Sequence, residues 1–262
     1  MLTIDFTGKV ALVTGGAGGI SSGIGRRFGD AGAKVYLADI NDAKLKTIVE
    51  EMRKDGIDAV ASHMDVTNEA EVKGVIDSIV ANEGALDILC CASGVIYAKP
   101  YMDTTEAELL RCLSVNLVGT NNCCQAALRH MIPKRQGKII TIGSATSRMG
   151  SATLSHYSMS KFGIVGLTQS IALAVAAHNI NVNGICPGFV NTEMMDIIFA
   201  ENSRTSGVPV KEIAERYEQT NIPLKRFQTP QDIGEAACFL ASDLAHNITG
   251  QCLNVCGAMR LN

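Results

Sequence analysis

Short apolar runs alternate with longer amphipathic stretches along most of the chain. Several of these runs are continuously apolar, which is typical of strands that are covered on both faces of a sheet. The predicted strands are Val10–Thr14, Val35–Asp39, Ala59–His63, Leu86–Cys91, Lys138–Ile142, Ile180–Cys186 and Cys252–Val255.

The stretches between these runs have the periodicity of helices. The predicted helices are Ile20–Ala31, Asp42–Lys54, Glu69–Asn82, Glu106–Met131, Tyr157–Ala177 and Pro230–Ala241. This repeat of strand and helix predicts an α/β fold with one doubly wound parallel sheet, in a single domain over residues 1–262. Residues 189–224 interrupt the repeat with a long stretch of mixed character. We expect this stretch, called the lid segment below, to be helical and to cover a substrate.

Composition narrows the class of protein. The chain has 262 residues, 47% of them hydrophobic and 19% charged, with a net charge of −3. These values are typical of a compact soluble protein and argue against nucleic acid or an anionic membrane as a partner. No stretch reaches the roughly 18–20 unbroken apolar residues of a membrane span.

Cysteine usage indicates a reducing compartment. The nine cysteines are odd in number, and the segment Met1–Lys9 shows no secretory signal, so we expect free thiols and a cytoplasmic protein. The adjacent pairs Cys90–Cys91 and Cys123–Cys124 lack the spacing of zinc ligands, and no metal site is expected.

A glycine-rich turn follows the first predicted strand. Gly15 and Gly19 bracket the turn, and Ile20 begins the next helix. Missing side chains at such a turn let the backbone approach a dinucleotide pyrophosphate at the helix N-terminus. Asp39 ends the second strand, with no Arg or Lys beside it. A carboxylate there binds both adenosine ribose hydroxyls and repels a 2′-phosphate, so we predict NAD rather than NADP; the alternative is a strand-end acid facing water.

The register of the turn has an alternative. A four-residue insertion would make Gly23 and Gly25 the phosphate-binding glycines. The ungapped register is preferred because it places Ile20, Ile24 and Phe28 on one buried helix face. It leaves two glycines inside the helix, each of which weakens a helix by about 1 kcal/mol relative to alanine.

Tyr157 and Lys161 lie four residues apart, which places them on one face of a predicted helix. A free tyrosine has a pKa near ~10, and lowering it to ~7 takes roughly 4 kcal/mol, which a cation about 4 Å away supplies at an effective dielectric constant of ~20. Ser144 follows a predicted strand, where its hydroxyl can hold a substrate oxygen. Asn116 stands in an otherwise apolar helix. Its amide forms either a structural hydrogen bond or part of a water-bridged proton path to Lys161.

Together these residues resemble the classical short-chain dehydrogenase/reductase family over essentially the whole chain. The motifs that carry the resemblance are Thr14-Gly15-x3-Gly19, Asp39, Asp65-Val66, Asn116, Ser144, Tyr157-x3-Lys161 and Pro187-Gly188-x3-Thr192. The resemblance implies a Rossmann fold, a catalytic tetrad of Asn116, Ser144, Tyr157 and Lys161, and no catalytic metal. It also implies a homotetramer, often formed through the two long central helices.

The resemblance further implies the cofactor contacts. Asp65 and Val66 would contact adenine, Thr192 the carboxamide, and Lys161 the nicotinamide ribose. The full expected set is Gly15, Gly19, Ile20, Asp39, Asp65, Val66, Gly94, Tyr157, Lys161, Pro187, Gly188, Val190 and Thr192. Two departures concern this set: Ser21 stands where the family has a third glycine, and Cys91–Gly94 reads Cys-Ala-Ser-Gly where the family has Asn-Asn-Ala-Gly. Neither departure removes a catalytic group.

The substrate is predicted from softer signals. The C-terminal half resembles sugar-alcohol and sugar-alcohol-phosphate dehydrogenases, and the polar segment that contains Thr146, Arg148 and His156 should face the substrate. We therefore expect NAD-dependent oxidation of a polyol or polyol phosphate. Arg148 would bind a phosphate or be a solvated loop arginine, and His156 would be a pocket-wall or surface residue rather than a second base. The same choice applies to three basic residues of the lid segment: Arg204, Lys211 and Arg216.

Three alternatives remain open at this point. Two are enzymes: a hydroxysteroid dehydrogenase, and a 3-oxoacyl reductase, which would more naturally use NADP. The third is a non-catalytic sensor or scaffold that binds NAD, an idea motivated by the altered Cys91–Gly94 sequence. The intact tetrad argues against the third alternative because a pure binding protein does not need all four groups.

Overall fold

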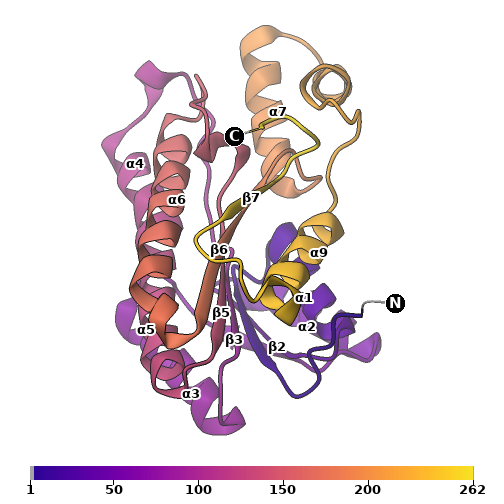
Figure 1. The fold of residues 1–262 in the computed structure, drawn as a ribbon. Coiled ribbons are helices and arrows are strands. Elements are labelled where there is room, and N and C mark those ends of the chain that lie inside the picture. Colours follow the sequence, from indigo (N-terminus) through magenta and orange to yellow (C-terminus); the bar gives the residue numbers. More distant parts are fainter. Residues whose placement is uncertain (1–2, 262) are drawn as a thin grey trace.

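The computed structural model describes residues 3–261, which form one seven-stranded parallel sheet between two layers of helices (Figure 1). The strand order is β3-β2-β1-β4-β5-β6-β7, so the order reverses between β1 and β4. Ligands of such sheets bind outside the carboxyl ends of the strands at this reversal. The strands are β1 (Val10–Thr14), β2 (Lys34–Asp39), β3 (Ala59–His63), β4 (Ile88–Cys91), β5 (Gly137–Ile142), β6 (Ile180–Pro187) and β7 (Cys252–Val255).

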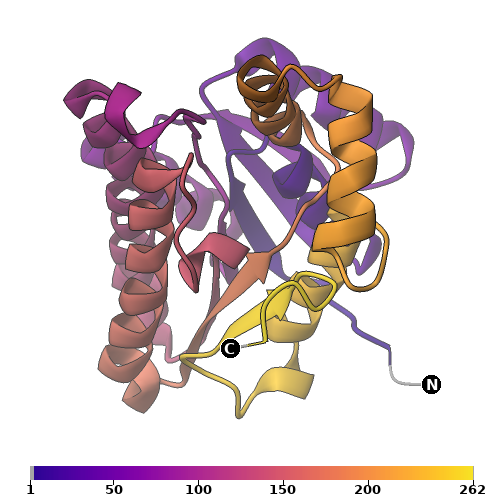
Figure 2. The same cartoon turned by 90° about the horizontal axis from the view of Figure 1, so that it is seen from above.

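The predicted fold is confirmed, and every predicted strand is present. The helices are α1 (Gly19–Asp30), α2 (Asp42–Lys54), α3 (Glu69–Glu83), α4 (Glu106–Leu113), α5 (Gly119–Lys134), α6 (Ser155–Val175), α7 (Glu193–Ser206), α8 (Val210–Arg216) and α9 (Pro230–Ala241). One face of the sheet is covered by α1, α2 and α9 and the other by α3, α5 and α6, as the view from above shows (Figure 2).

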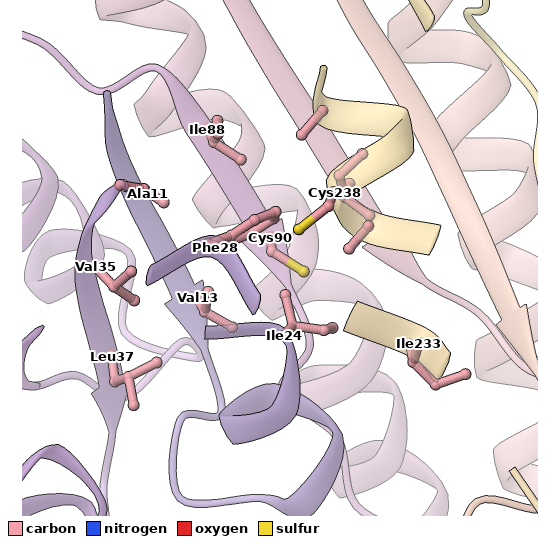
Figure 3. Close-up of a cluster of buried hydrophobic side chains, with 14 of the residues drawn as sticks. Ala11, Val13, Ile24, Phe28, Val35, Leu37, Ile88, Cys90, Ile233 and Cys238 are labelled. Carbon is pink, nitrogen blue, oxygen red and sulfur yellow. The ribbon is translucent and has the colours of Figure 1, made fainter. Parts of the chain in front are cut away.

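The glycines of α1 allow it to pack closely against its neighbours. A Cβ atom at Gly23 would lie 2.4 Å from the Cβ atom of Pro230 at the start of α9, and one at Gly25 would lie 2.7 Å from Leu37 of β2. Ile24 and Phe28 are fully buried between α1, α9 and the sheet (Figure 3). The ungapped register of the glycine turn is confirmed, because α1 begins at Gly19 and contains Gly23 and Gly25.

The prediction of one helix over Glu106–Met131 was wrong in one respect. A π-helical turn, Ser114–Val118, separates α4 from α5. Asn116 lies at its centre, with its side chain bonded to the backbone of Val95 beyond the helix. An extra residue in one turn re-aims a side chain without ending a helix, and such turns are frequent at functional sites.

The lid segment forms two helices, α7 and α8, followed by the π-helical turn Tyr217–Asn221. It leaves the sheet at the carboxyl end of β6 and stands beyond that end in light orange (Figure 1). Aromatic side chains hold it together, since the ring of Tyr217 lies 4.9 Å from that of Phe189 and 5.4 Å from that of Phe199.

One helical stretch, Ser155–His178, is long and apolar enough to cross a membrane by length and composition. It comprises α6 and its continuation, and it packs along β6 in the helical layer of the fold. A core helix of an α/β protein passes the same test, so this is weak evidence for a membrane span.

Candidate active site

Two adjoining hollows lie at the carboxyl ends of the strands. The inner cavity has a volume of about 310 Å³ and is lined by Ser144, Tyr157 and Lys161. The outer cleft has a volume of about 510 Å³ and is lined by the glycine turn and Asp39. Both hollows share the side chains of Ile20 and Thr192 as walls, so a ligand in the cleft reaches the cavity.

Tyr157 and Lys161 are brought together in the first turns of α6. Their exposed fractions are 8% and 4%, and the Lys161 Nζ atom lies 5.5 Å from the centroid of the Tyr157 ring. Nζ also donates a hydrogen bond of 2.7 Å to the carbonyl oxygen of Ile142 at the end of β5. This bond fixes the ammonium beside the phenol.

Burial acts on both groups. It raises the pKa of the Tyr157 phenol, and it lowers the pKa of Lys161 to about 8. A hydrogen bond from Ser144 opposes the effect of burial on Tyr157 by stabilising the phenolate. In the ligand-free protein burial thus favours the neutral phenol of Tyr157, and a phenolate there needs the positive charge of Lys161 together with that of a bound cationic ligand.

Ser144 is held rigidly at the end of β5. Its Oγ atom accepts a 3.1 Å bond from the amide of Thr146, and its own amide donates to Ser147 Oγ at 3.0 Å. The Ser147 hydroxyl in turn donates to the carbonyl oxygen of Lys161 at 2.8 Å. The strand end and the helix that carries Lys161 are therefore one hydrogen-bonded unit.

Asn116 is fully buried and joins the segment after β4 to α6. Its Oδ1 atom accepts a 2.8 Å bond from the amide of Val95, and its Nδ2 atom donates to Val95 O at 3.0 Å and to Ser160 Oγ at 2.9 Å. Ser160 then donates to the carbonyl oxygen of Tyr157. The structural hydrogen bonds that were one alternative for Asn116 are therefore present, and they position the turn that carries Tyr157.

The outer cleft is shaped by close backbone approaches. A Cβ atom at Gly15, which has a φ of +68°, would lie 2.7 Å from Ser93 Cα, and one at Gly19 would lie 2.7 Å from Thr192 Cγ2. The Asp39 carboxylate accepts bonds from the amides of Ala17 at 3.1 Å and Asn41 at 2.9 Å. Asp39 is thereby fixed at the rim of the cleft, next to the glycine turn.

All predicted cofactor positions line one of these two hollows. Besides the residues just described, they are Ile20, Asp65, Val66, Gly94, Pro187, Gly188, Val190 and Thr192. At Gly94 a Cβ atom would lie 3.5 Å from Asn116 Oδ1 and 3.8 Å from Lys161 Nζ, which places this glycine in van der Waals contact with the groups beside Tyr157. The cleft fits an extended dinucleotide because its floor is backbone and its far rim carries a carboxylate.

The altered Cys91–Gly94 sequence is steadied by a different residue. Thr14 Oγ1 at the end of β1 accepts bonds from the amides of Ala92 at 3.1 Å and Ser93 at 3.2 Å. Sequence reasoning left the source of this support open. The threonine hydroxyl on the adjacent strand provides it.

The substrate residues are only partly where they were expected. Thr146 lines the inner cavity, but Arg148 and His156 are not among its lining residues. The helical turn Ala145–Ser147 redirects the chain, so that Arg148 donates to Cys252 O of β7 at 3.1 Å. His156 is buried beside Ser155. The basic residues of the lid segment also lie outside the lining: Arg204 pairs with Glu201, and Lys211 with Glu215, and Arg216 lies elsewhere on α8.

Sequence reasoning also missed most of the cavity wall. The wall is largely apolar, and its members come from four separate segments: Ile96, Met149, Leu154, Phe189, Met195, Ile198, Tyr217 and Met259. Arg260 completes it from the C-terminal turn. No local pattern marks these residues, because the lid segment and the C-terminal turn meet only in the folded chain. Within residues 3–261, no group of three or more His, Cys, Asp or Glu side chains could hold a metal ion.

Known proteins resemble this chain over nearly all of its length. A family model described as enoyl-(acyl carrier protein) reductase matches residues 15–259. A 3-oxoacyl-[acyl-carrier-protein] reductase of Chlamydia pneumoniae is 32% identical over 258 residues, which cover 98% of this chain and 99% of that protein.

A short-chain dehydrogenase/reductase of Armillaria gallica is 37% identical over 255 residues, 96% of each chain. Among solved structures, a variant of actinorhodin polyketide ketoreductase with NADPH superposes with a TM-score of 0.93 at 30% identity, over 96% of this chain and 97% of that one. The chain is therefore an oxidoreductase that belongs to the classical short-chain dehydrogenase/reductase family.

Proposed function

We propose that this protein transfers a hydride reversibly between NAD and a secondary alcohol or ketone. The observation that carries the proposal is that Ser144, Tyr157 and Lys161 line one cavity, which shares walls with the glycine-lined cleft. Nicotinamide, when bound, supplies the hydride acceptor or donor. The glycine turn supports this proposal, since a Cβ atom at Gly15 or Gly19 would lie 2.7 Å from Ser93 Cα or Thr192 Cγ2 and would break the close approach that shapes the cleft.

The chain's own groups hold the oxygen and move its proton. In the oxidative direction Ser144 orients the alcohol oxygen, and Tyr157 as phenolate accepts the hydroxyl proton. Lys161 stabilises the phenolate. In the reductive direction the same phenol returns its proton to the ketone oxygen. Asn116 holds the turn that carries Tyr157. The proton passes between Tyr157 and solvent by way of Lys161, without Asn116.

NAD is proposed over NADP because Asp39 stands at the far rim of the cleft. Its carboxylate would accept the ribose hydroxyls and repel a 2′-phosphate. NADP is the second candidate, supported by the structural neighbour that was solved with NADPH.

For the substrate, the apolar cavity wall favours an alcohol with an apolar body over the polyol expected from the loop sequence. A 3-oxoacyl thioester is a second candidate, because a relative is a 3-oxoacyl-[acyl-carrier-protein] reductase. A polyol, a polyol phosphate and a hydroxysteroid remain comparison substrates for the test.

The test is the appearance of NADH absorbance with purified protein, NAD⁺ and a panel of these alcohols, with NADP⁺ in parallel. Turnover that is lost in Tyr157→Phe, while NAD binding is retained, supports the proposal. If no alcohol is turned over and Tyr157→Phe alters nothing measurable, the enzyme proposal fails and a sensor or scaffold that binds NAD takes its place.

We also propose a homotetramer in the cytoplasm. Large apolar side chains are exposed on the layer that contains α4, α5 and α6, namely Leu110, Val118, Met159, Phe162 and Leu173. A second copy of the chain would cover them. Light scattering on purified protein tests the oligomeric state.

All nine cysteines are free thiols, which fits the reducing compartment proposed for the protein.

A further inference from the structure

The C-terminal turn places a guanidinium in the wall of the inner cavity, where the proposed hydride transfer has no use for it. Arg260 lines the cavity beside Met259. Its Nη1 atom donates to Met259 O at 2.6 Å, whereas its Nε atom is buried without a partner within residues 3–261. Arginine carries five donors and a permanent charge, and the Nη2 atom of Arg260 makes no hydrogen bond within residues 3–261, so this group is available to a ligand.

No carboxylate of residues 3–261 forms an ion pair with this charge. Among the described residues that line the inner cavity there is no Asp or Glu, and the ion pairs found over residues 3–261 do not include Arg260. The other cation of the lining, Lys161, is engaged by Ile142 O and stands beside Tyr157. Lys161 is thus committed to Tyr157, and Arg260 is the second cation among the described lining residues, which one negative charge on a ligand would match.

The turn that carries Arg260 is held by hydrogen bonding and packing. The Arg260 amide donates to Cys256 Sγ at 3.4 Å. Gly257 and Ala258 both have positive φ values, +60° and +68°, which reverse the chain sharply after β7. A Cβ atom at Gly257 would lie 2.7 Å from Ile222, so the turn is packed on the base of the lid segment. Arg260 is thus held against the cavity before any ligand arrives.

We propose that the substrate is a hydroxy acid, or the corresponding keto acid, whose carboxylate binds Arg260 while its apolar body contacts the cavity wall. This inference rests on the proposed hydride transfer at Tyr157. A carboxylate suits the site because it accepts two parallel bonds from one edge of a guanidinium. A phosphate monoester carries up to two charges, and the other cation among the described lining residues, Lys161, is committed to Tyr157.

The experiment compares 2-, 3- and 4-hydroxy acids of medium chain length with their methyl esters, using NAD⁺ and the full-length protein. The esters keep the shape and remove the charge. The wild type should prefer the acid. Arg260→Leu should lower the acid-to-ester ratio of kcat/KM by roughly 10- to 100-fold, which is the range expected when hydrogen bonds to a charged group are lost. Most of this change should appear as a higher KM for the acid. Arg260→Lys should restore part of the ratio.

Arg226→Leu is the matched control, because Arg226 is an exposed arginine near the base of the lid segment and does not line the cavity. Its ratio should equal that of the wild type. A wild type that prefers esters, or an Arg260→Leu variant that affects acids and esters equally, overturns the inference while leaving the hydride transfer intact.

A binding measurement separates the two proposals if no alcohol in the panel is oxidised. Octanoate, which cannot react, is titrated calorimetrically into NAD⁺-loaded wild type and Arg260→Leu. Binding to the wild type alone supports the carboxylate site even though the reaction proposal has failed. Equal binding to both proteins, or binding to neither, overturns it.

Discussion

Replacing Lys161 with methionine tests the electrostatic argument for Tyr157. Both side chains are almost fully buried, and Nζ lies 5.5 Å from the ring centroid, so solvent screens their interaction little. A unit charge at this separation is worth about 3 kcal/mol at an effective dielectric constant of ~20, which corresponds to roughly two pKa units. Without the ammonium, the pKa of Tyr157 should rise by that amount.

The rate of alcohol oxidation should follow this shift. Because the phenolate accepts the proton, the rising limb of the pH–rate profile should move about two units towards higher pH, and turnover near neutral pH should fall roughly 100-fold. Burial lowers the pKa of Lys161 itself to about 8. The charge that supports Tyr157 in the free enzyme is therefore present below that pH and is lost above it.

The assay is the initial rate of NADH formation at saturating NAD⁺ across the pH range, with NAD affinity measured separately by fluorescence. Lys138→Met is the matched control. Lys138 is a partly buried lysine of β5 that donates to Asn181 Oδ1 at 2.8 Å, away from the inner cavity, and its variant should keep the wild-type profile. A Lys161→Met profile with an unmoved midpoint and intact NAD binding would refute the reasoning.

Two further predictions concern the cofactor and the core. Asp39→Ser should lower the ratio of kcat/KM for NAD⁺ over NADP⁺ by about tenfold or more, because it removes a carboxylate that binds ribose and repels a 2′-phosphate; an unchanged ratio would contradict the assignment. Gly23→Ala should destabilise the protein by about 1–3 kcal/mol in urea unfolding, because its Cβ atom would meet the Pro230 ring and backbone at 2.4–2.8 Å. Gly74→Ala is the control, since nothing lies within 4 Å of a Cβ atom there and the helix should gain about 1 kcal/mol.

The sequence predicted the scaffold well, because strands covered on both faces are marked by continuous apolar runs. Val10–Thr14, Ala59–His63 and Cys252–Val255 were predicted to the residue. The convergence of Tyr157 and Lys161 followed from their spacing on one helix.

The substrate side could not be predicted in the same way. Arg148 was expected either to bind a substrate phosphate or to be a solvated loop arginine, but a single helical turn directs it to β7 instead. Arg260 belongs to the cavity only because two residues with positive φ reverse the chain before it. Such placements depend on tertiary contacts between segments far apart in the sequence, and no local periodicity records them.

The start of the lid segment is joined to Gln228, four residues beyond its end. Val190 and Gln228 form a parallel bridge, Gln228 donates its amide to Phe189 O at 2.9 Å, and Asn191 donates to Gln228 O at 2.9 Å. The segment is therefore a long insertion whose start is hydrogen-bonded to the chain just beyond its end. Each doubling of the length of such an insertion adds only about 0.6 kcal/mol to the entropic cost of closing it. Changes in the length and sequence of the lid segment can therefore alter substrate specificity while the strands, the proton-transfer groups and the cofactor cleft stay unchanged.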